Sequence, residues 1–283
     1  MSLMPAVKKD EALVTEMDSL LDDKEHFYLW WLGQSGYLLQ WQGHRVLIDP
    51  YLSDSLTKKY VFTHKPHIRI SERVIDPELL KRISIVTSSH NHTDHLDAET
   101  LIPVLKNNPG IRFVIPEANR KYVSERVQCD ENFPSGLNAG LSLTIGSFTF
   151  HGIPAKHNEI EKDERGFCKY MGFVIEFGPW KIYHSGDTLW YDEMVDLLRP
   201  FEVDVALLPI NGNDPAREVA GNLNTREAVE LGKSINAKWV IPCHYDMFRF
   251  NTADVKDFEK GAKALHQSYK ILKGGERFEI PGL

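Results

Sequence analysis

The sequence has few cysteines and no long apolar segment. Its three cysteines, Cys129, Cys168 and Cys243, lie far apart in the 283 residues and form no Cys-x-x-Cys pair. Such a set provides no disulfide framework and is typical of a reducing compartment, so we expect a cytoplasmic protein. No apolar run reaches the length of a signal peptide or a membrane-spanning helix. We therefore expect no association with a membrane.

Positive charge is also scarce. The chain has 33 Lys and Arg against 40 Asp and Glu, a formal net charge of -7, and the basic residues are scattered. A nucleic-acid groove needs concentrated positive charge, so the composition favours a small-molecule substrate and leaves a homo-oligomer open. Linkers and short repeats are absent as well. We therefore predict a single domain over residues 1–283, with a leader and surface helix in 1–26 and the core in 27–272.

The remaining sequence alternates strand patterns with helix patterns. Between residues 27 and 49, short aromatic and β-branched runs break at glycines, which is typical of hairpin strands. Residues 82–89, RISIVTSS, resemble a strand buried on both faces, whereas 53–78 lack periodicity. The pattern predicts further strands over 111–116, 141–152, 170–177, 180–184, 203–209 and 238–242, and helices over 10–22, 98–106, 117–126, 189–198, 224–235 and 252–266. Together these elements predict an α/β (α+β) protein with two mixed sheets between outer helices.

The segment SSHNHTDHLD, residues 88–97, contains three histidines and two aspartates. His90 and His92 are one residue apart, so in an extended segment they point the same way and could hold one cation. Asp94 and His95 then turn to the other side. Imidazoles and carboxylates are the usual ligands of divalent transition metals, and two adjacent sites need about six to eight such groups. Further ligands must therefore come from later in the chain.

Three later segments supply such residues. His157 follows the strand that ends in GIP, Asp187 follows YHSG, and His244 follows VIPC. Each lies where a strand gives way to a loop, which is where α/β enzymes gather their active groups. An isolated His-x-His would be weak, but this coincidence predicts a site for two divalent ions, with Zn or Mn first and Fe as a further option.

In this order and context, the residues resemble the metallo-β-lactamase superfamily of metal-dependent hydrolases over roughly residues 27–272. The resemblance implies the metallo-β-lactamase fold, a four-layer αββα sandwich. Asp49, at the end of VLIDP, is similar to the aspartate of the first motif of the superfamily, which braces the metal loop. The resemblance assigns one ion to His90, His92 and His157, a second ion to Asp94, His95 and His244, and a bridging position to Asp187.

Four segments are most similar to the branch that contains the L-ascorbate-6-phosphate lactonases: WWLGQSGYLL, YHSGDT, VDVALLPI and NAKWVIPCHYDMF. This similarity implies a lactonase-like or esterase-like enzyme with a small, anionic substrate. The match is poor around His157 and at PINGNDPAREV, loops that would touch the substrate. The similarity therefore does not identify the particular lactone that this protein would cleave.

A two-metal site implies a hydrolytic mechanism. Two divalent ions a few ångströms apart share a water and lower its pKa toward about 7, which provides a bridging hydroxide. We expect this hydroxide to cleave an ester or lactone, with Asp94, Asp187 and His244 as the catalytic members of the site. Tyr245 and His184 are candidate proton donors or supporting groups.

Other readings of the same residues are less favoured. A phosphodiesterase or nuclease would share the metal site but would need a basic track or a clamping domain. A non-catalytic metal-binding scaffold would have no reason to keep seven ligands in place. The flavin-linked di-iron oxidoreductases of the same fold carry a carboxylate where this chain has His92, so histidine favours hydrolysis.

For several residues near the predicted site, the sequence suggests further roles. Lys156, Arg165 and Arg217 flank the substrate loops and could bind a phosphate. Cys243 is expected to face the core, because neighbours on a strand point to opposite sides. The segment HKPHIR, residues 64–69, is expected to be a solvated loop rather than a flap over the site.

Overall fold

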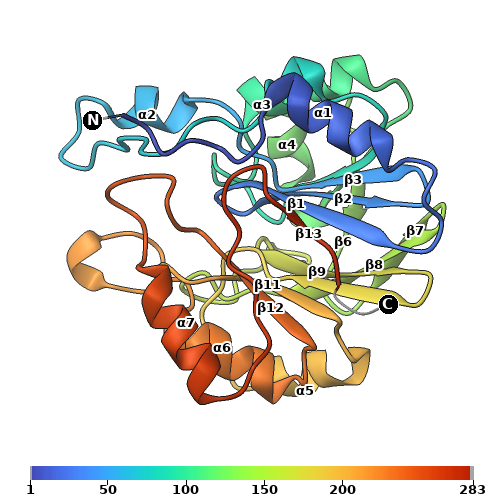
Figure 1. Cartoon of the computed structure of the whole chain (residues 1–283). Helices are drawn as coiled ribbons and strands as arrows, with labels where there is room; N and C mark the ends of the chain where they lie inside the picture. The colour runs from blue at the N-terminus through green and yellow to red at the C-terminus, as the bar shows by residue number, and fades with distance from the viewer. Residues whose placement is uncertain (1, 281–283) are drawn as a thin grey trace.

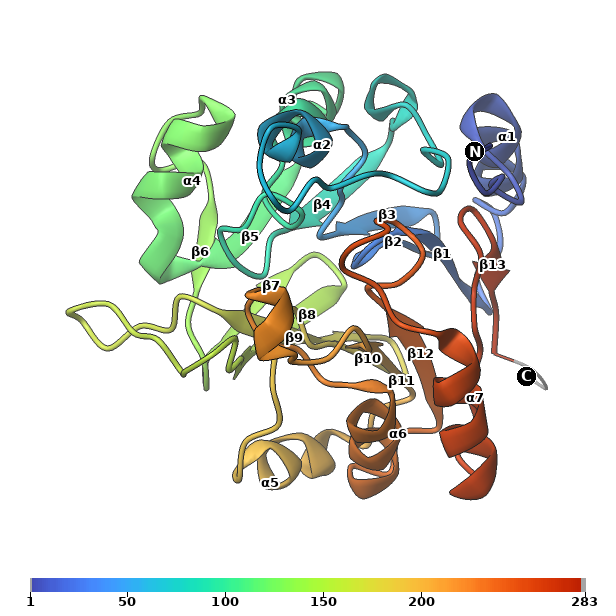
Figure 2. The same ribbon diagram turned by 90° about the vertical axis from the view of Figure 1, so that its left-hand side faces the viewer.

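The computed structural model describes residues 2–280 of the chain. Two β-sheets lie face to face, and helices cover the outer face of each sheet (Figures 1 and 2). This arrangement is the four-layer αββα sandwich, so the predicted fold class is confirmed. The division into a leader and a core within a single domain stays a prediction.

The first sheet has seven strands within the described residues, in the order β13-β1-β2-β3-β4-β5-β6. Strands β1 to β3 form consecutive antiparallel hairpins, and β3 to β6 pair in parallel. The strands are β1 (Phe27–Gly33), β2 (Gly36–Trp41), β3 (His44–Ile48), β4 (Ile83–Thr87), β5 (Arg112–Pro116), β6 (Ser135–Leu137) and β13 (Arg277–Phe278). Its outer face is covered by α1 (Asp10–Ser19), α3 (Ala98–Asn107) and α4 (Arg120–Val127), with 3-10 turns η1 (Pro77–Leu79) and η2 (Glu117–Asn119).

The second sheet has six strands in the same described range, in the order β12-β11-β10-β9-β8-β7. Strands β7 to β10 pair antiparallel, whereas β10 to β12 are parallel. The strands are β7 (Ser142–Ile145), β8 (Phe148–Pro154), β9 (Met171–Phe177), β10 (Trp180–His184), β11 (Val205–Pro209) and β12 (Trp239–Cys243). Its outer face carries α5 (Met194–Leu198), η3 (Arg199–Phe201), α6 (Thr225–Ser234) and α7 (Val255–Ala264), and the short turn η4 (Pro215–Arg217) lies in the loop before α6.

Side-chain alternation explains why the chain forms four layers. In β1, Leu29 and Trp31 face the second sheet, whereas Trp30 and Leu32 face the outer helices. Both sets are buried, so this strand is apolar on both faces and needs a cover on each side. The outer cover is the amphipathic α1, which turns Leu13 toward the sheet.

The structure differs from the predicted elements in several places. Residues 53–78, predicted to be irregular, contain the short helix α2 (Ser55–Tyr60). The strand predicted over 141–152 is a hairpin of two strands that turns at Gly146, where φ is +59° and glycine is favoured. Of the helix predicted over 189–198, only the second half forms a helix, α5 (Met194–Leu198). Strands β6 and β13 were missed, because two or three residues are too short to show alternation.

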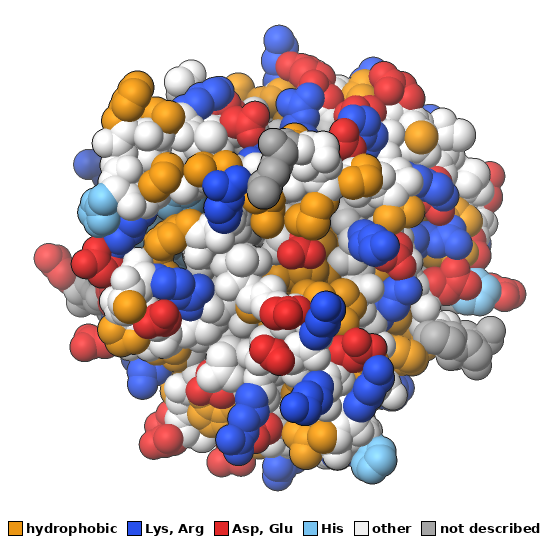
Figure 3. Space-filling view, turned by 60° about the vertical axis from the view of Figure 1, so that its left-hand side comes forward, with side chains coloured by type: hydrophobic (Ala, Val, Ile, Leu, Met, Phe, Trp, Pro, Cys, Tyr) orange, Lys and Arg blue, Asp and Glu red, His pale blue; other side chains and the backbone are white. Residues whose placement is uncertain are grey.

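The described part of the chain contains no helix that combines the length and the apolar character needed to cross a bilayer. On the face shown in Figure 3, Lys and Arg side chains are interspersed with Asp and Glu side chains.

Candidate metal centre

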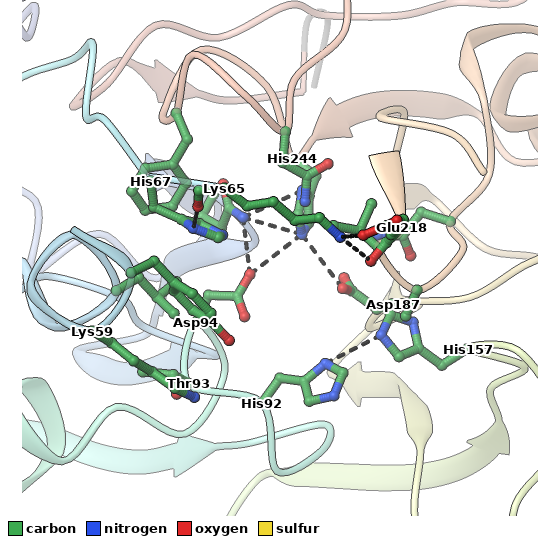
Figure 4. A pocket seen from close by; sticks show the side chains of 18 of the residues that line it. Lys59, Lys65, His67, His92, Thr93, Asp94, His157, Asp187, Glu218 and His244 are labelled. Atoms are coloured by element: carbon green, nitrogen blue, oxygen red, sulfur yellow. Dashed lines mark hydrogen bonds and ion pairs between the residues drawn. The ribbon is translucent and has the colours of Figure 1, made fainter. Parts of the chain in front are cut away.

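The predicted site residues meet at one edge of the sandwich. Strands β8, β10 and β12 run in the same direction, so the loops after their carboxyl ends emerge together. His157, Asp187 and His244 follow these three strands. The loop between β4 and α3 faces them from the first sheet and carries the other four predicted ligands (Figure 4). The tertiary structure thus brings all seven residues together.

The seven side chains form two clusters, which we call the site floor. Within each cluster, one potential ligand atom from every residue lies within 4.8 Å of the others. The first cluster consists of His90, His92 and His157, and the second consists of Asp94, His95, Asp187 and His244. The ring centroids of His90 and His95 are 4.1 Å apart, so the clusters are adjacent.

Asp187 lies in the second cluster. Its Oδ1 is 3.2 Å from His95 Nε2, and its Oδ2 is 3.4 Å from His244 Nε2. In the first cluster, His157 Nε2 is 3.1 Å from His92 Nδ1. The division into two clusters agrees with the ligand sets that the resemblance implies, whereas the bridging position of Asp187 stays a prediction.

The site floor fits divalent metal ions. His90 Nε2 is buried and has no hydrogen-bond partner in the described structure, and His95 Nε2 and Asp187 Oδ1 face each other at 3.2 Å without hydrogen-bond geometry. A buried polar atom without a partner costs about 1–3 kcal/mol, so a buried cluster of such poorly satisfied atoms needs a reason. Imidazole nitrogens and carboxylate oxygens that converge on one point are the donors that Zn²⁺ and similar ions take.

The two clusters differ in their charge. Burial lowers the pKa of His157 to about 4 and holds the pKa of His90 well below its usual value. Burial also opposes the charge of His244, but Asp187 and Asp94 outweigh it and raise the pKa of His244 to about 9. The first cluster therefore offers neutral imidazoles, whereas in the second the imidazoles hold protons that an ion would displace.

The carboxylate of Asp49 orients His95. Thr87 Oγ1 donates to Asp49 Oδ1 at 2.8 Å, and the backbone N–H of Ser89 donates to the same oxygen at 3.0 Å. Asp49 Oδ2 in turn lies 2.8 Å from His95 Nδ1, which leaves His95 Nε2 toward Asp187. Burial disfavours the Asp49 carboxylate, but the nearby His184 and His95 lower its pKa overall. The structure therefore places Asp49 where the resemblance expects the bracing aspartate.

Backbone carbonyls and caps position other parts of the floor. His157 Nδ1 donates to the Gly221 carbonyl at 3.1 Å, so Nε2 is left for the cluster. Asp97 accepts the backbone N–H of Thr100 at the start of α3 and thus caps this helix. Gln34, in the β1–β2 turn, donates from Nε2 to Asp94 Oδ2 at 2.9 Å. Gln34 lies inside the segment WWLGQSGYLL, but nothing in the local sequence pattern distinguishes it as a site residue.

The other predicted residues lie away from the cavity. His184 is fully buried, and its Nε2 donates to the Ser35 carbonyl at 3.0 Å. The hydroxyl of Tyr245 donates to the Leu272 carbonyl, and its ring stacks on Trp31 at 4.5 Å. Neither residue lines the pocket above the floor, so the structure favours supporting rather than proton-donating positions for both.

The candidate phosphate-binding residues also have other partners or positions. Lys156 forms a backbone bridge to Leu189 and lies outside the pocket lining. Arg165 pairs with Asp163 at 3.0 Å, and Arg217 donates to the carbonyl of Gly212 at 3.1 Å. Cys243 is buried in the core between the sheets, as predicted.

A pocket of about 730 Å³ lies over the site floor. Two segments form what we call the pocket wall, residues 56–67 on one side and 218–222 on the other. They meet where Lys65 Nζ lies 2.5 Å from Glu218 Oε2 (Figure 4). The segment 64–69 is a loop with His64 exposed, as predicted, but it is not solvated throughout, because His67 packs against Tyr60 and lines the pocket. No local pattern reveals this, since the packing involves distant residues.

The fold and the paired clusters define a class of enzymes. A family model described as "Beta-lactamase superfamily domain" matches residues 28–244. The chain therefore belongs to the metal-dependent hydrolases of the metallo-β-lactamase superfamily. The superfamily prediction is confirmed, whereas the relation to the lactonase branch stays a prediction.

Within that class, the chain belongs to the family described as "UPF0173 metal-dependent hydrolase". The relative from Archaeoglobus fulgidus is 31% identical over 257 residues, which cover 88% of this chain and 97% of the relative. The relative from Caldivirga maquilingensis is 27% identical over 256 residues, which cover 90% and 98%. Among solved structures, the isothiocyanate hydrolase from Delia radicum gut bacteria has a TM-score of 0.70 at 18% identity, covering 89% of this chain and 98% of that one, a likeness of fold alone.

Proposed function

We propose that this metal-dependent hydrolase binds two divalent ions, Zn or Mn, and cleaves a small, anionic ester or lactone. One observation carries the proposal: two adjacent clusters of imidazoles and carboxylates form the floor of a single pocket. His90, His92 and His157 would hold one ion, Asp94, His95 and His244 the other, and Asp187 would serve both. When bound there, such ions polarise a carbonyl and lower the pKa of water toward neutrality.

The residues of the chain supply orientation and desolvation. Gln34 directs the Asp94 carboxylate by a hydrogen bond of 2.9 Å, and Asp49 holds the ring of His95. The carboxyl pKa of Asp187 stays well below its usual value, because His244 and His95 outweigh the effect of burial. The carboxylates of the floor are therefore ionised at neutral pH, as ligands must be.

The pocket wall supports a small anionic substrate. A volume of about 730 Å³ falls within the range of small-molecule pockets. Lys59 and Lys65 line it, together with the rings of Tyr60 and Tyr170. The lysines could pair with a carboxylate or phosphate, and the rings could cover a sugar or lactone ring. The mixed charges in Figure 3 favour such a small molecule over nucleic acid.

We also propose that the protein works in the cytoplasm. Cys129, Cys168 and Cys243 are all unpaired, and the last two are buried. Free thiols in this number are typical of a reducing compartment.

The test combines metal analysis with a substrate panel. Protein purified without chelators is expected to contain close to two equivalents of metal by elemental analysis. Lactones, phosphorylated sugar lactones, alkyl esters and phosphodiesters are then assayed with Zn, Mn and Fe. Preferential turnover of anionic lactones or esters supports the proposal. Turnover of phosphodiesters alone would support the alternative hydrolase, and absence of metal after reconstitution would contradict both.

A further inference from the structure

His67 lines the pocket from the pocket wall and belongs to neither cluster of the site floor. Its ring stacks on Tyr60 with 4.4 Å between centroids, and it meets the edges of Phe248 at 5.2 Å and Phe250 at 5.6 Å. Thr57 Oγ1 donates to the His67 carbonyl at 2.7 Å, which anchors the backbone to α2. The imidazole is therefore held in one orientation while it lines the pocket (Figure 4).

The hydrogen bonds of the ring define its tautomer. His67 Nδ1 lies 3.0 Å from the carbonyl oxygen of Lys65. A carbonyl only accepts, so Nδ1 carries the proton, and in the neutral ring Nε2 presents a lone pair. Within residues 2–280, no side chain or backbone group is hydrogen-bonded to Nε2. Burial lowers the pKa of His67, which favours this neutral form at pH 7. Nε2 is thus available to a molecule in the pocket.

We propose that His67 is the residue that transfers a proton to the leaving group. This inference rests on the proposed ester or lactone hydrolysis. The oxygen derived from water bonds to the acyl carbon, and the proton that it still carries passes to His67 Nε2. The bond from the acyl carbon to the leaving oxygen then breaks, its electron pair stays on that oxygen, and Nε2 returns the proton there. The ring ends neutral, and no further reactant is needed.

The two residues that the sequence offers as proton donors, and Lys65 in the pocket wall, are less suited to this transfer. Both ring nitrogens of His184 have partners: Nε2 donates to Ser35, and Nδ1 accepts the backbone N–H of Gly186 at 3.4 Å. The hydroxyl of Tyr245 is directed to Leu272. Lys65 is paired with Glu218. His67 combines a defined tautomer, a free ring nitrogen and a place in the pocket lining.

The leaving-group dependence of His67→Gln tests the inference. An alkoxide needs a proton as it departs, whereas a nitrophenolate leaves without one. For alkyl esters or lactones we expect kcat to fall by about 10²–10⁴-fold, against about threefold or less for nitrophenyl esters. KM and metal content are expected to stay at the wild-type values. His44→Gln, which changes an exposed histidine outside the pocket, is the matched control.

Two results would overturn the inference while leaving the proposed function intact. One is an equal loss, or no loss, of kcat for both classes of ester in His67→Gln. The other is a proton on Nε2 rather than Nδ1, seen by ¹⁵N NMR of histidine-labelled, zinc-loaded wild-type protein, with His67→Gln used for assignment. The NMR measurement does not depend on how the variant folds. Failure of the wild-type enzyme on every ester and lactone would instead contradict the proposed function, and the inference with it.

Discussion

The site floor and the pocket wall are built in different ways. On the floor, His95 is 0% exposed and Asp187 is 4% exposed, and each has several charged or hydrogen-bonding neighbours. In the wall, the side chain of Lys65 is 20% exposed and that of Glu218 is 66% exposed, and the pair joins two loops. Substitution of one member of a buried, interdependent group of charges is costly for the whole group. A solvated ion pair, by contrast, contributes little to stability by itself. We therefore expect substitutions on the floor to have larger effects on metal binding and turnover than substitutions of the ion pair in the wall.

Asp187→Ala is expected to have the largest effect, because it removes the proposed ligand carboxylate that contacts both His95 and His244. Metal affinity and turnover should each fall by more than about 100-fold, since even the loss of a group that only supports a ligand costs 10–100-fold. Elemental analysis and steady-state kinetics check this. Wild-type turnover in the variant would show that the ligand assignment is wrong. Asp192→Ala, an exposed change in the following loop, is the control.

Asp49→Asn tests whether the floor depends on its support. The amide keeps the shape of the side chain but loses the charge that faces His95. Metal affinity should fall by about 10–100-fold, which is typical for a group that orients a ligand. Titration with a competing chelator measures the affinity, and circular dichroism shows whether the fold is kept. An unchanged affinity in a folded variant would remove Asp49 from this role.

Lys65→Met tests selection by the wall. Loss of the ammonium should raise KM for anionic lactones or esters by about tenfold, since a hydrogen bond to a charged group contributes about 1.5–3 kcal/mol, part of it already spent on Glu218. KM for neutral esters and the metal content should stay constant. Lys58→Met is the matched control, because Lys58 lies in α2, earlier in the same part of the chain, but pairs with Glu99 outside the pocket lining. Equal effects on charged and neutral substrates would argue against anion recognition.

Glu218→Gln should have the smallest effect, and in the opposite direction. Lys65 lowers the pKa of the Glu218 carboxyl, so this group is ionised at pH 7 and competes with an anionic substrate. Its neutralisation should lower KM for anionic substrates by about twofold, as expected for an exposed ion pair. Kinetics at low and high salt measure the change, with Glu230→Gln, a partly exposed residue of another ion pair, as the control. A higher KM would mean that the pair holds the wall in its binding shape.

Much of the floor was predictable, because each of its residues follows a recognisable strand. The run ISIVT before His90 and the run WVIPC before His244 are apolar, and the polar group at the end of each stands out. The helix cap at Asp97 was predictable for the same local reason. By contrast, residues 53–78 show no periodicity, so the short helix α2 and the direction of His67 could not be read from them.

The sequence by itself determined which residues have ligand chemistry and at which strand ends they stand, because strand patterns and ligand types are local properties. Only the tertiary structure decided that Lys65 meets Glu218, 153 positions further along the chain, and that His67 lines the pocket between Tyr60 and Phe248. The tertiary structure also directs the side chains of Tyr245 and His184 to buried backbone carbonyls, away from the pocket. These contacts arise when two sheets pack, and packing between distant segments leaves no trace in a local pattern.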